Sequence, residues 1–348
     1  MKAAVLHKGG IIRYEDWPDP RLKSGEVLVR VRAAGICGSD LPRVLSGKAH
    51  YYPIVLGHEF SGDVVDVNGG TGRITPGMRV SGVPLVPCMA CSDCARGDYA
   101  LCRHYTFIGS RVQGSFAEYV ALPETNVVPF DSAVSYEQGA LFEPSAVALH
   151  GLLQSDWKPG EETAVLGGGT IGQFTAQWAR IMGAKDVTVF DLEDSRLELA
   201  TRLGAAAGIN TRIDGFMDEA LARTDGKGFG MVFETAGSVA TMRMAFELAA
   251  NKAGVCFIGT PHEDLSYTPA LWEQMNRKEF KLTGSWMSYS APFPGMEWTL
   301  TAHAFKKGTL RYDEDMIYRT FPLHQAQEAF DLYRTPGTVQ GKVLFLLD

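Results

Sequence analysis

The feature that most restricts the fold is a glycine-rich segment at residues 167–172, with the sequence Gly-Gly-Gly-Thr-Ile-Gly. It follows an apolar, β-prone run at residues 163–166 and precedes a helical pattern that extends to Met182. Such a strand-to-helix turn brings backbone amides and a helix N-terminus close to a pyrophosphate. Asp191 ends the next β-prone run, where its carboxylate can accept hydrogen bonds from both hydroxyls of an adenosine ribose. The pattern predicts a dinucleotide-binding domain.

The same segment supplies the candidate cofactor-binding residues. An acid at position 191 would repel a 2′-phosphate, so NAD is favoured over NADP. Arg196 lies near the same strand end and leaves NADP open as an alternative. The alternative is that the glycine segment is only a tight turn and Asp191 only a surface residue, with no ligand bound to either. The candidates are Gly167, Gly169, Thr170, Ile171, Gly172, Asp191 and Arg196.

The pattern of the chain changes near residue 150. Before it, short β-prone runs are separated by turn residues, which predicts an irregular all-β region. After it, β-prone runs alternate with helical segments such as residues 195–203, which predicts a parallel, doubly wound sheet. Beyond about residue 285 the alternation ends, and the tail is expected to return to the first region. The early runs are residues 26–31, 60–65 and 117–120, and the later ones are residues 163–166, 187–190, 231–234 and 255–258.

Composition excludes several classes of partner. The 348 residues carry 40 acidic and 33 basic side chains, a net charge of −7, with no basic block. This argues against nucleic acid and against an anionic membrane surface. No apolar run reaches the roughly 18 residues of a membrane helix, and the N-terminus lacks the long apolar run of a secretory signal. We therefore expect a cytoplasmic protein with small-molecule ligands.

A cluster of four cysteines predicts a metal site. Cysteine thiolates within one short segment can surround a tetrahedral zinc ion and leave no position for water or substrate. The site they predict is therefore structural. In a reducing compartment, metal binding is favoured over disulfides, and free surface cysteines are the alternative. The four are Cys88, Cys91, Cys94 and Cys102.

A second set of metal-binding residue types is dispersed along the chain. Cys37 lies in a Gly-Ile-Cys-Gly-Ser-Asp segment, and His58 and Glu59 follow Gly57. A lone cysteine is usually a small core residue, and a Gly-His-Glu triplet is often only a turn. Their occurrence together with a four-cysteine site and a dinucleotide fingerprint favours a functional site.

In this order, the motifs resemble the zinc-containing medium-chain dehydrogenases over the whole chain. The matching segments are residues 35–40, 57–59, the four cysteines, residues 142–144, the glycine fingerprint and Asp191. The resemblance implies an α/β plus β fold, a GroES-like catalytic domain with an inserted Rossmann domain built on a doubly wound parallel sheet. The catalytic domain would comprise residues 1–146 and 286–348, and the NAD-binding domain residues 147–285. A homodimer or homotetramer is also implied.

The resemblance further implies NAD and two zinc ions per subunit, one catalytic and one structural. Cys37, His58 and Glu143 would bind the catalytic zinc. Glu59 could ligate directly, exchange with water, or stay outside the ligand shell. Ser39 would pass on the substrate proton, and Asp40 would orient the ligands. Many family members have a histidine five residues after the first zinc cysteine, where this chain has Pro42; His50, a water chain or the ribose hydroxyls are the alternative proton exits.

Longer segments resemble the branch of the family that acts on polyols and their phosphates. They are residues 37–43, 49–53, 107–111, 284–290 and 292–298. They imply oxidation of a secondary hydroxyl on a polyol or polyol phosphate, most narrowly of galactitol 1-phosphate to tagatose 6-phosphate. Arg43 or Arg111 would bind the phosphate, since arginine pairs with phosphate in a bidentate manner; solvated surface arginines are the alternative. The substrate-binding candidates are Arg43, His50, Arg111, Trp286, Ser288 and Tyr289, with packing as the alternative for the aromatic residues.

Three other functions stay open. The first is an NAD-dependent dehydrogenase of an unphosphorylated polyol, a sugar acid or a threonine-like alcohol. The second is a non-enzymatic structural relative without catalytic zinc, and the third is a zinc-independent quinone reductase. The joint presence of Cys37, His58 and Glu143 disfavours the last two.

Overall fold

The computed structural model describes residues 1–348 and divides into two compact units. The first comprises Met1–Glu143, Tyr289–Gly308 and Glu314–Asp348, and the second comprises Pro144–Ser288 and Thr309–Asp313. The second unit is therefore inserted in the first. The structure sets the boundaries a few residues from the predicted ones, because helix α4 (Phe142–Gln154) begins in the first unit and continues into the second. The short return at Thr309–Asp313 has no counterpart in the predicted domains.

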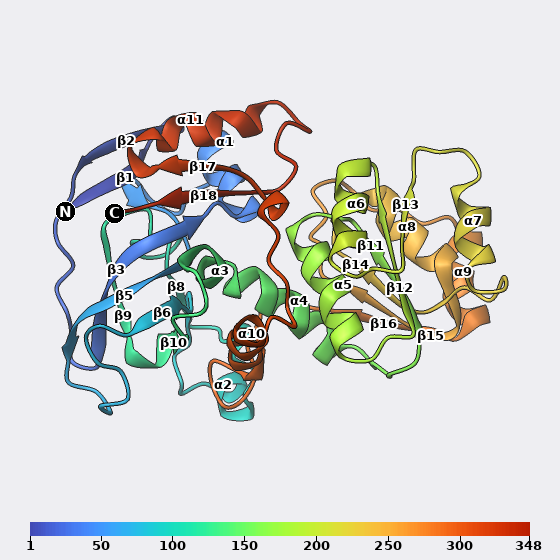
Figure 1. The fold of residues 1–348 in the computed structure, drawn as a ribbon, viewed down its shortest axis with the longest axis horizontal. Coiled ribbons are helices and arrows are strands. Elements are labelled where there is room, and N and C mark those ends of the chain that lie inside the picture. Colours follow the sequence, from blue (N-terminus) through green and yellow to red (C-terminus); the bar gives the residue numbers. More distant parts are fainter. The chain divides into compact units, whose positions relative to one another are not determined.

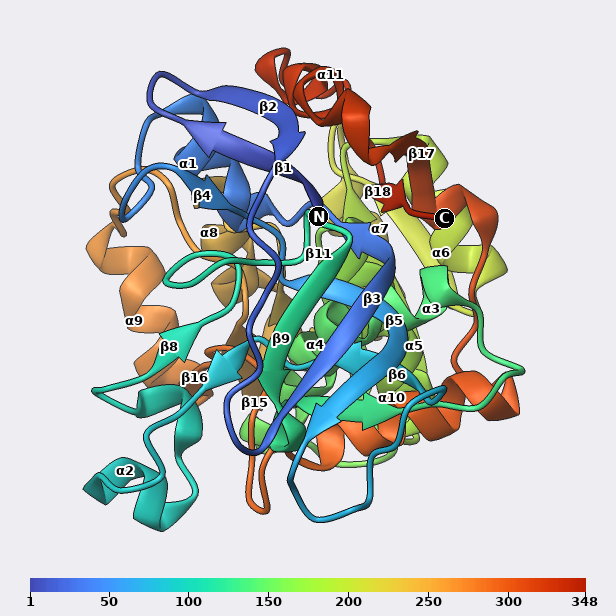
Figure 2. The ribbon, with the colours of Figure 1, turned by 90° about the vertical axis from the view of Figure 1, so that its left-hand side faces the viewer.

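The first unit is organised around a seven-stranded sheet. Its strand order is β10-β6-β5-β3-β18-β17, and β9 also pairs with β3 (Figure 2). The C-terminal strand β18 lies antiparallel to β3, so the tail of the chain completes the sheet of the first region, as predicted. The strands are β3 (Glu26–Gly35), β5 (Glu59–Asn68), β6 (Arg79–Gly82), β9 (Tyr119–Pro123), β10 (Val127–Pro129), β17 (Ile317–Pro322) and β18 (Lys342–Leu346).

Two smaller sheets and several short helices complete this unit. One sheet has the order β2-β1-β4, and β7 pairs with β8. Their strands are β1 (Lys2–His7), β2 (Ile11–Asp16), β4 (Ile54–Val55), β7 (Leu85–Val86) and β8 (Thr106–Phe107). The α-helices are α1 (Leu41–Leu45), α2 (Ser92–Arg96), α3 (Tyr136–Ala140), α10 (Met296–Lys307) and α11 (Ala326–Asp331). The 3₁₀ helices are η1 (Gly38–Asp40), η2 (Tyr99–Leu101), η3 (Glu124–Asn126), η4 (Glu314–Met316), η5 (Leu323–Gln325) and η6 (Leu332–Arg334).

The second unit is a six-stranded, fully parallel sheet with the order β13-β12-β11-β14-β15-β16 (Figure 1). The order reverses at β11, and right-handed crossovers therefore place helices on both faces of the sheet. The strands are β11 (Glu162–Leu166), β12 (Asp186–Asp191), β13 (Ala207–Asn210), β14 (Phe229–Glu234), β15 (Ala249–Phe257) and β16 (Lys281–Gly284). The helices are α5 (Thr170–Ile181), α6 (Asp194–Arg202), α7 (Phe216–Ala222), α8 (Val239–Leu248) and α9 (Pro269–Lys278).

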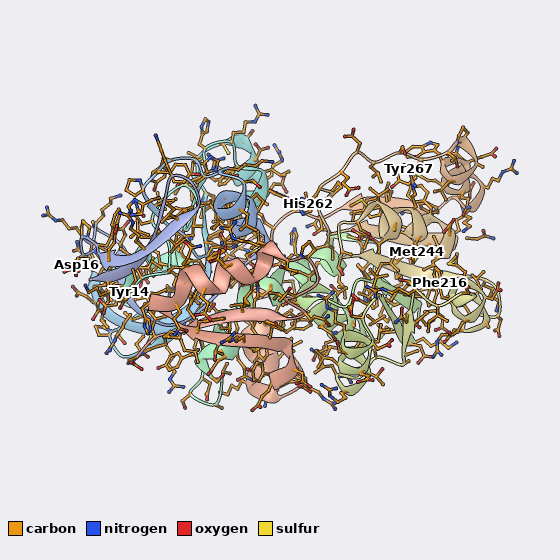
Figure 3. All side chains as sticks on the ribbon, turned by 90° about the horizontal axis from the view of Figure 1, so that it is seen from above. Tyr14, Asp16, Phe216, Met244, His262 and Tyr267 are labelled. Carbon is orange, nitrogen blue, oxygen red and sulfur yellow. The ribbon has the colours of Figure 1, made fainter.

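Apolar side chains from the strands and helices of the second unit form its core. Met244 on α8 is buried there, and Phe216 and Tyr267 pack against the same cluster (Figure 3). The predicted strands at residues 163–166, 187–190 and 231–234 and the predicted helix from residue 171 are confirmed as β11, β12, β14 and α5. None of the helices has the length and apolar character needed to cross a bilayer.

Candidate active site and metal centres

The glycine-rich turn joins β11 to α5 in the second unit. A Cβ at Gly172 would lie 1.7 Å from the carbonyl oxygen of Gly167, so only glycine permits this close packing of turn and helix. Gly169 is the N-cap of α5, and a Cβ there would meet nothing within 4 Å. Its cap lacks a side-chain hydrogen bond, so no side chain of the N-cap satisfies the first backbone amides of α5, which include those of Thr170 and Ile171. This arrangement fits a pyrophosphate.

Asp191 stands at the C-terminal end of β12, beside this turn. One carboxylate oxygen accepts a 2.6 Å hydrogen bond from the backbone N–H of Gly168, and the other accepts from the N–H groups of Leu192 and Glu193. The Arg196 guanidinium lies 3.5 Å from the first oxygen. The carboxylate is thereby fixed at the glycine turn, where an adenosine ribose would lie.

Three dispersed residues meet in the first unit. The donor atoms of Cys37, His58 and Glu59 all lie within 4.8 Å of one another. Cys37 is the N-cap of η1, and its sulfur accepts hydrogen bonds from the backbone N–H of Ser39 at 3.5 Å and from the Ser39 hydroxyl at 3.4 Å. Asp40 completes this cap, since its side chain accepts from the Cys37 N–H at 3.2 Å. The local sequence therefore positions the thiol by capping.

The β3–β5 ladder places the other two donors. Glu59 begins β5 and pairs with Gly35, where a Cβ would lie 2.5 Å from the Glu59 Oε2, so glycine is needed beside this carboxylate. The neighbouring His58 is 3% exposed, and its Nδ1 lies 3.6 Å from a carboxylate oxygen of the fully buried Asp40. That contact orients the imidazole toward the cluster. Burial raises the pKa of Asp40, although the His58 and Arg43 charges oppose the rise.

Sequence reasoning missed Lys342, the first residue of β18. Its ammonium group forms an ion pair with the Glu59 carboxylate and donates a 3.1 Å hydrogen bond to the Ile36 carbonyl. Both charged residues are buried, at 6% and 1% exposure. Burial alone would lower the pKa of Lys342, but the charges of Glu59 and Cys37 raise it above its ordinary value. No local motif surrounds Lys342, so only the pairing of β18 with β3 reveals its role.

Glu143 lies in the first turn of α4, at the edge of the same buried group. It is 8% exposed, and its carboxylate is not within the 4.8 Å set. Burial, followed by the nearby Glu59 charge, raises the pKa of Glu143 to about 7. Burial and Glu59 also raise the pKa of the Cys37 thiol. The cluster therefore holds more potential negative charge than His58 and Lys342 can balance, and a bound cation would relieve this imbalance.

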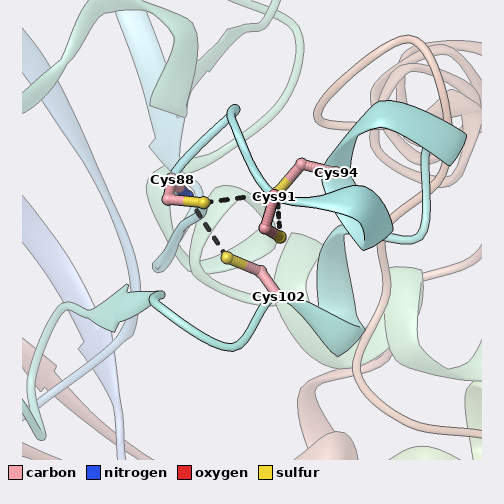
Figure 4. Close-up of side chains that lie close together, drawn as sticks. All are labelled: Cys88, Cys91, Cys94 and Cys102. Carbon is pink, nitrogen blue, oxygen red and sulfur yellow. Dashed lines mark hydrogen bonds between the residues drawn. The ribbon is translucent and has the colours of Figure 1, made fainter.

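The four clustered cysteines converge in the first unit. Their sulfurs lie within 4.8 Å of one another (Figure 4). Backbone N–H groups, the Cys94 amide first, lower the pKa of Cys91 to about 6, and the amides of Ala90 and Cys91 lower that of Cys88. Burial raises the pKa of Cys94 to about 12. Its thiolate form at neutral pH therefore requires a bound metal ion to stabilise the charge. The arrangement fits a closed tetrahedral ion.

Both units of the chain match families of known proteins. Residues 23–132 match the alcohol dehydrogenase GroES-like domain, and residues 170–302 match the zinc-binding dehydrogenase domain. Galactitol 1-phosphate 5-dehydrogenase of Escherichia coli K12 is 37% identical over 347 residues, which cover 99% of this chain and 100% of that protein. The chain belongs to the zinc-binding alcohol dehydrogenase family.

Solved structures agree with this assignment. The crystal structure of galactitol-1-phosphate dehydrogenase from Escherichia coli matches this dehydrogenase with a TM-score of 0.93 over 100% of both chains, at 37% identity. A zinc-binding dehydrogenase from Sinorhizobium meliloti 1021, bound to NADP, matches with a TM-score of 0.89 at 30% identity over 99% of each chain. Sorbitol dehydrogenase of Bacillus subtilis is 34% identical over 269 residues, 76% of each protein. Because these relatives are dehydrogenases, the alternative of a non-enzymatic structural protein is disfavoured for this chain.

Both donor sets of this dehydrogenase fit the zinc that its family binds. The Cys37 cluster combines a thiol, an imidazole and carboxylates, which are the ligand types of zinc. The His58 Nδ1 lies 3.6 Å from the Asp40 carboxylate, so Nε2 is the nitrogen that remains for a metal ion. The four sulfurs supply the closed set of a structural site.

The predicted substrate-binding residues have very different environments. Arg43 donates hydrogen bonds to the Ser39 carbonyl and to Asp40, whereas Arg111 and His50 are exposed. Tyr289 is 3% exposed, its hydroxyl accepts a hydrogen bond from the Leu85 N–H, and its ring stacks on the rings of Phe293 and Trp298. These contacts are those of a packed residue, and the substrate-binding role of Tyr289 stays a prediction. In the second unit, Trp286 is exposed and Ser288 is buried.

Proposed function

We propose that this dehydrogenase oxidises a secondary hydroxyl of a polyol or polyol phosphate with NAD, most narrowly galactitol 1-phosphate to tagatose 6-phosphate. The observation that carries the proposal is the convergence of the donor atoms of Cys37, His58 and Glu59, with Glu143 beside them. A carboxylate here makes the ligand set harder than a second thiolate would, which suits a substrate rich in hydroxyls. The full-length similarity to a galactitol 1-phosphate 5-dehydrogenase supports the narrow substrate.

Cys37, His58 and Glu143 would hold the catalytic zinc and leave one position for the substrate hydroxyl. Glu59, which forms an ion pair with Lys342, would exchange with that position or stay outside the ligand shell. When bound, zinc lowers the pKa of a substrate hydroxyl, and NAD accepts the hydride. The four cysteines would hold a second, structural ion. The protein residues contribute position and charge balance around these groups.

We propose that Ser39 relays the substrate proton by accepting it while passing its own hydroxyl proton to water. Its hydroxyl lies 3.4 Å from the Cys37 sulfur, and its oxygen is also 3.4 Å from an Arg43 nitrogen. Ser39 is exposed, so a proton that reaches its oxygen can pass directly to water. This exposure gives a proton route that does not require a histidine at Pro42.

Asp191 supports NAD as the cofactor. Its side chain is 7% exposed and fixed by backbone hydrogen bonds, so a 2′-phosphate beside it would meet a carboxylate that cannot move away. Arg196, 3.5 Å away, neutralises part of that charge. We therefore expect a preference for NAD with residual use of NADP, although a relative binds NADP.

The edge strand of the second unit supports a homodimer or homotetramer. β16 pairs only with β15, which leaves its other edge open for a second copy of the chain. Light scattering of the purified protein would give the oligomeric state; a monomer at micromolar concentration would contradict this part of the proposal.

The test is the rate of NADH formation by the zinc-loaded enzyme with galactitol 1-phosphate, sorbitol 6-phosphate, galactitol, sorbitol, threonine and galactonate. The proposal predicts the highest kcat/KM for galactitol 1-phosphate, and a lower rate when NADP replaces NAD. The second candidate is a dehydrogenase of unphosphorylated polyols, which the similarity to a sorbitol dehydrogenase favours. A higher kcat/KM for sorbitol or galactitol would select it and contradict the phosphorylated substrate.

A further inference from the structure

We propose that Arg111, stacked on Tyr105, is the group that binds the phosphate of the substrate. The inference rests on the proposed function, because it requires a polyol phosphate as substrate. It also chooses between the two arginines that the sequence left equivalent, and it adds an aromatic partner that the sequence did not indicate. Four observations carry it: the attachment of the Arg111 loop to the metal site, the strand face, the stacking, and the charge.

The loop that carries Arg111 is attached directly to the metal site. The ring of Phe107 contacts the His58 ring edge-on, with 5.4 Å between their centroids. A Cβ at Gly109 or at Gly114 would lie 2.2 or 2.3 Å from the Gly57 carbonyl oxygen. The backbone of this loop therefore packs against the residue that precedes His58. Packing this close to backbone prevents the loop from shifting away without disturbing His58.

The strand register shows which side chains face His58. In β8, Phe107 pairs with Leu85, and Thr106 pairs with Val86. Thr106 and Val86 line a cavity of about 440 Å³ on one face of the strand pair. Side chains alternate along a strand, so Phe107, which contacts His58, is on the other face. Tyr105 directly precedes β8, two residues before Phe107.

A tight turn returns Arg111 to this strand end. The backbone N–H of Arg111 donates a 2.9 Å hydrogen bond to the Phe107 carbonyl. The guanidinium then lies over the Tyr105 ring, 4.5 Å from its centroid, and donates a 3.3 Å hydrogen bond to the Tyr105 hydroxyl. Stacking on an aromatic ring holds a guanidinium plane in one orientation and leaves most of its N–H groups free. The arrangement is a positioned arginine rather than a freely solvated one.

The charge of Arg111 is also uncompensated. Arg111 forms no ion pair, whereas Arg43 lies 3.4 Å from the buried Asp40 carboxylate and donates to the Ser39 carbonyl. The charge of Arg43 is therefore already balanced by Asp40. If Arg43 turned away to bind a phosphate, the buried Asp40 would lose this cation. A phosphate dianion is instead attracted to Arg111, which can offer two parallel N–H groups. Arg111 would thus bind the phosphate while the other end of the polyol reaches the His58 cluster.

The experiment measures kcat/KM for galactitol 1-phosphate and for galactitol in the wild type and in R111A. Losing a hydrogen-bonded charge pair should lower kcat/KM for the phosphorylated substrate by about 10- to 100-fold, mostly through KM, and leave that for galactitol unchanged. R103A is the matched control, because Arg103 lies in the same segment but faces Asp93 at 3.6 Å with 79% of its side chain exposed. It should change neither value. Y105F, which keeps the ring, should lose only a few-fold, and Y105A should approach R111A.

A second readout does not depend on turnover. Inorganic phosphate, titrated calorimetrically, should bind the wild type, R103A and Y105F more tightly than R111A. Equal losses for galactitol and its phosphate in R111A, or no loss for either, would overturn the role of Arg111. A wild type with no preference for galactitol 1-phosphate would instead refute the phosphorylated substrate of the proposed function. In that case, phosphate binding that is equal in wild type and R111A would refute the anion site as well.

Discussion

The buried ion pair between Lys342 and Glu59 leads to a quantitative prediction about stability. Replacing Lys342 by methionine keeps most of the apolar part of the side chain but removes its charge. The Glu59 carboxylate, 1% exposed, then lies beside the buried Asp40 and Glu143 without its lysine partner. Removing one partner of a buried ion pair costs about 3–5 kcal/mol. We therefore expect the zinc-free K342M protein to be less stable than the zinc-free wild type by about 3–5 kcal/mol.

Calorimetric unfolding of the zinc-free proteins is the assay. For domains of about 150–250 residues, each kcal/mol shifts Tm by roughly 2–4 °C, so Tm should fall by on the order of 10 °C. The double variant K342M/E59Q should recover most of the loss, because it no longer buries an unpaired carboxylate. K185M is the surface control: its ion pair with Glu162 is 2.6 Å long, but Lys185 is 64% exposed, so its loss should cost at most about 1 kcal/mol.

Two results would refute this reasoning. The first is a K342M protein that loses no more stability than K185M, which would mean that burial does not strengthen the pair. The second is a double variant as unstable as K342M, which would mean that packing of the lysine side chain, and not the charge of Glu59, causes the loss. Bound zinc should reduce the effect of K342M, since it supplies positive charge to the same carboxylates.

Three further predictions concern the other sites. Gly172→Ala should raise the Kd for NADH more than 10-fold, because its Cβ would lie 1.7 Å from a backbone oxygen. An unchanged Kd in a fluorescence titration would contradict the turn geometry. Because the metal-free pKa of Glu143 is raised from 4.5 to about 7, its proton is displaced when zinc binds, and zinc affinity should rise with pH across this interval more steeply in the wild type than in E143Q. Competition with a chelator measures this, and parallel slopes would contradict it. Cys94→Ser should lower the zinc content from two ions to one per subunit by mass spectrometry and should lower Tm; unchanged zinc content would remove the structural site.

Much of the fold was predictable because its signals are local in the sequence. The glycine turn, the strand that precedes it and the acid at Asp191 follow from spacing within one βαβ unit. The four cysteines likewise lie within one short segment, and the structure brings their sulfurs together. The prediction that strands alternate with helices into a parallel sheet is confirmed for the same reason.

The remainder depends on contacts between distant segments. Lys342 reaches Glu59 only because β18 pairs with β3, and no sequence pattern connects these residues. The difference between Arg43 and Arg111 is set by their partners, Asp40 for one and the Tyr105 ring for the other. The aromatic segment that contains Tyr289 has the composition of a cleft wall or of a core, and its pattern does not show that Tyr289 is buried while Trp286 is exposed. Tertiary packing determines each of these environments.

The dependence of oxidation on the Cys37 site is tested most directly by a zinc titration of the metal-stripped enzyme, with NADH formation from galactitol 1-phosphate as the readout. We expect the stripped wild type to be inactive and its activity to return as zinc fills the Cys37 site. We also expect Cys37→Ser, which should keep its four-cysteine zinc, to recover little activity. NADH formation by the stripped enzyme, or full activity of Cys37→Ser, would contradict the claim that this donor set holds the zinc on which oxidation depends.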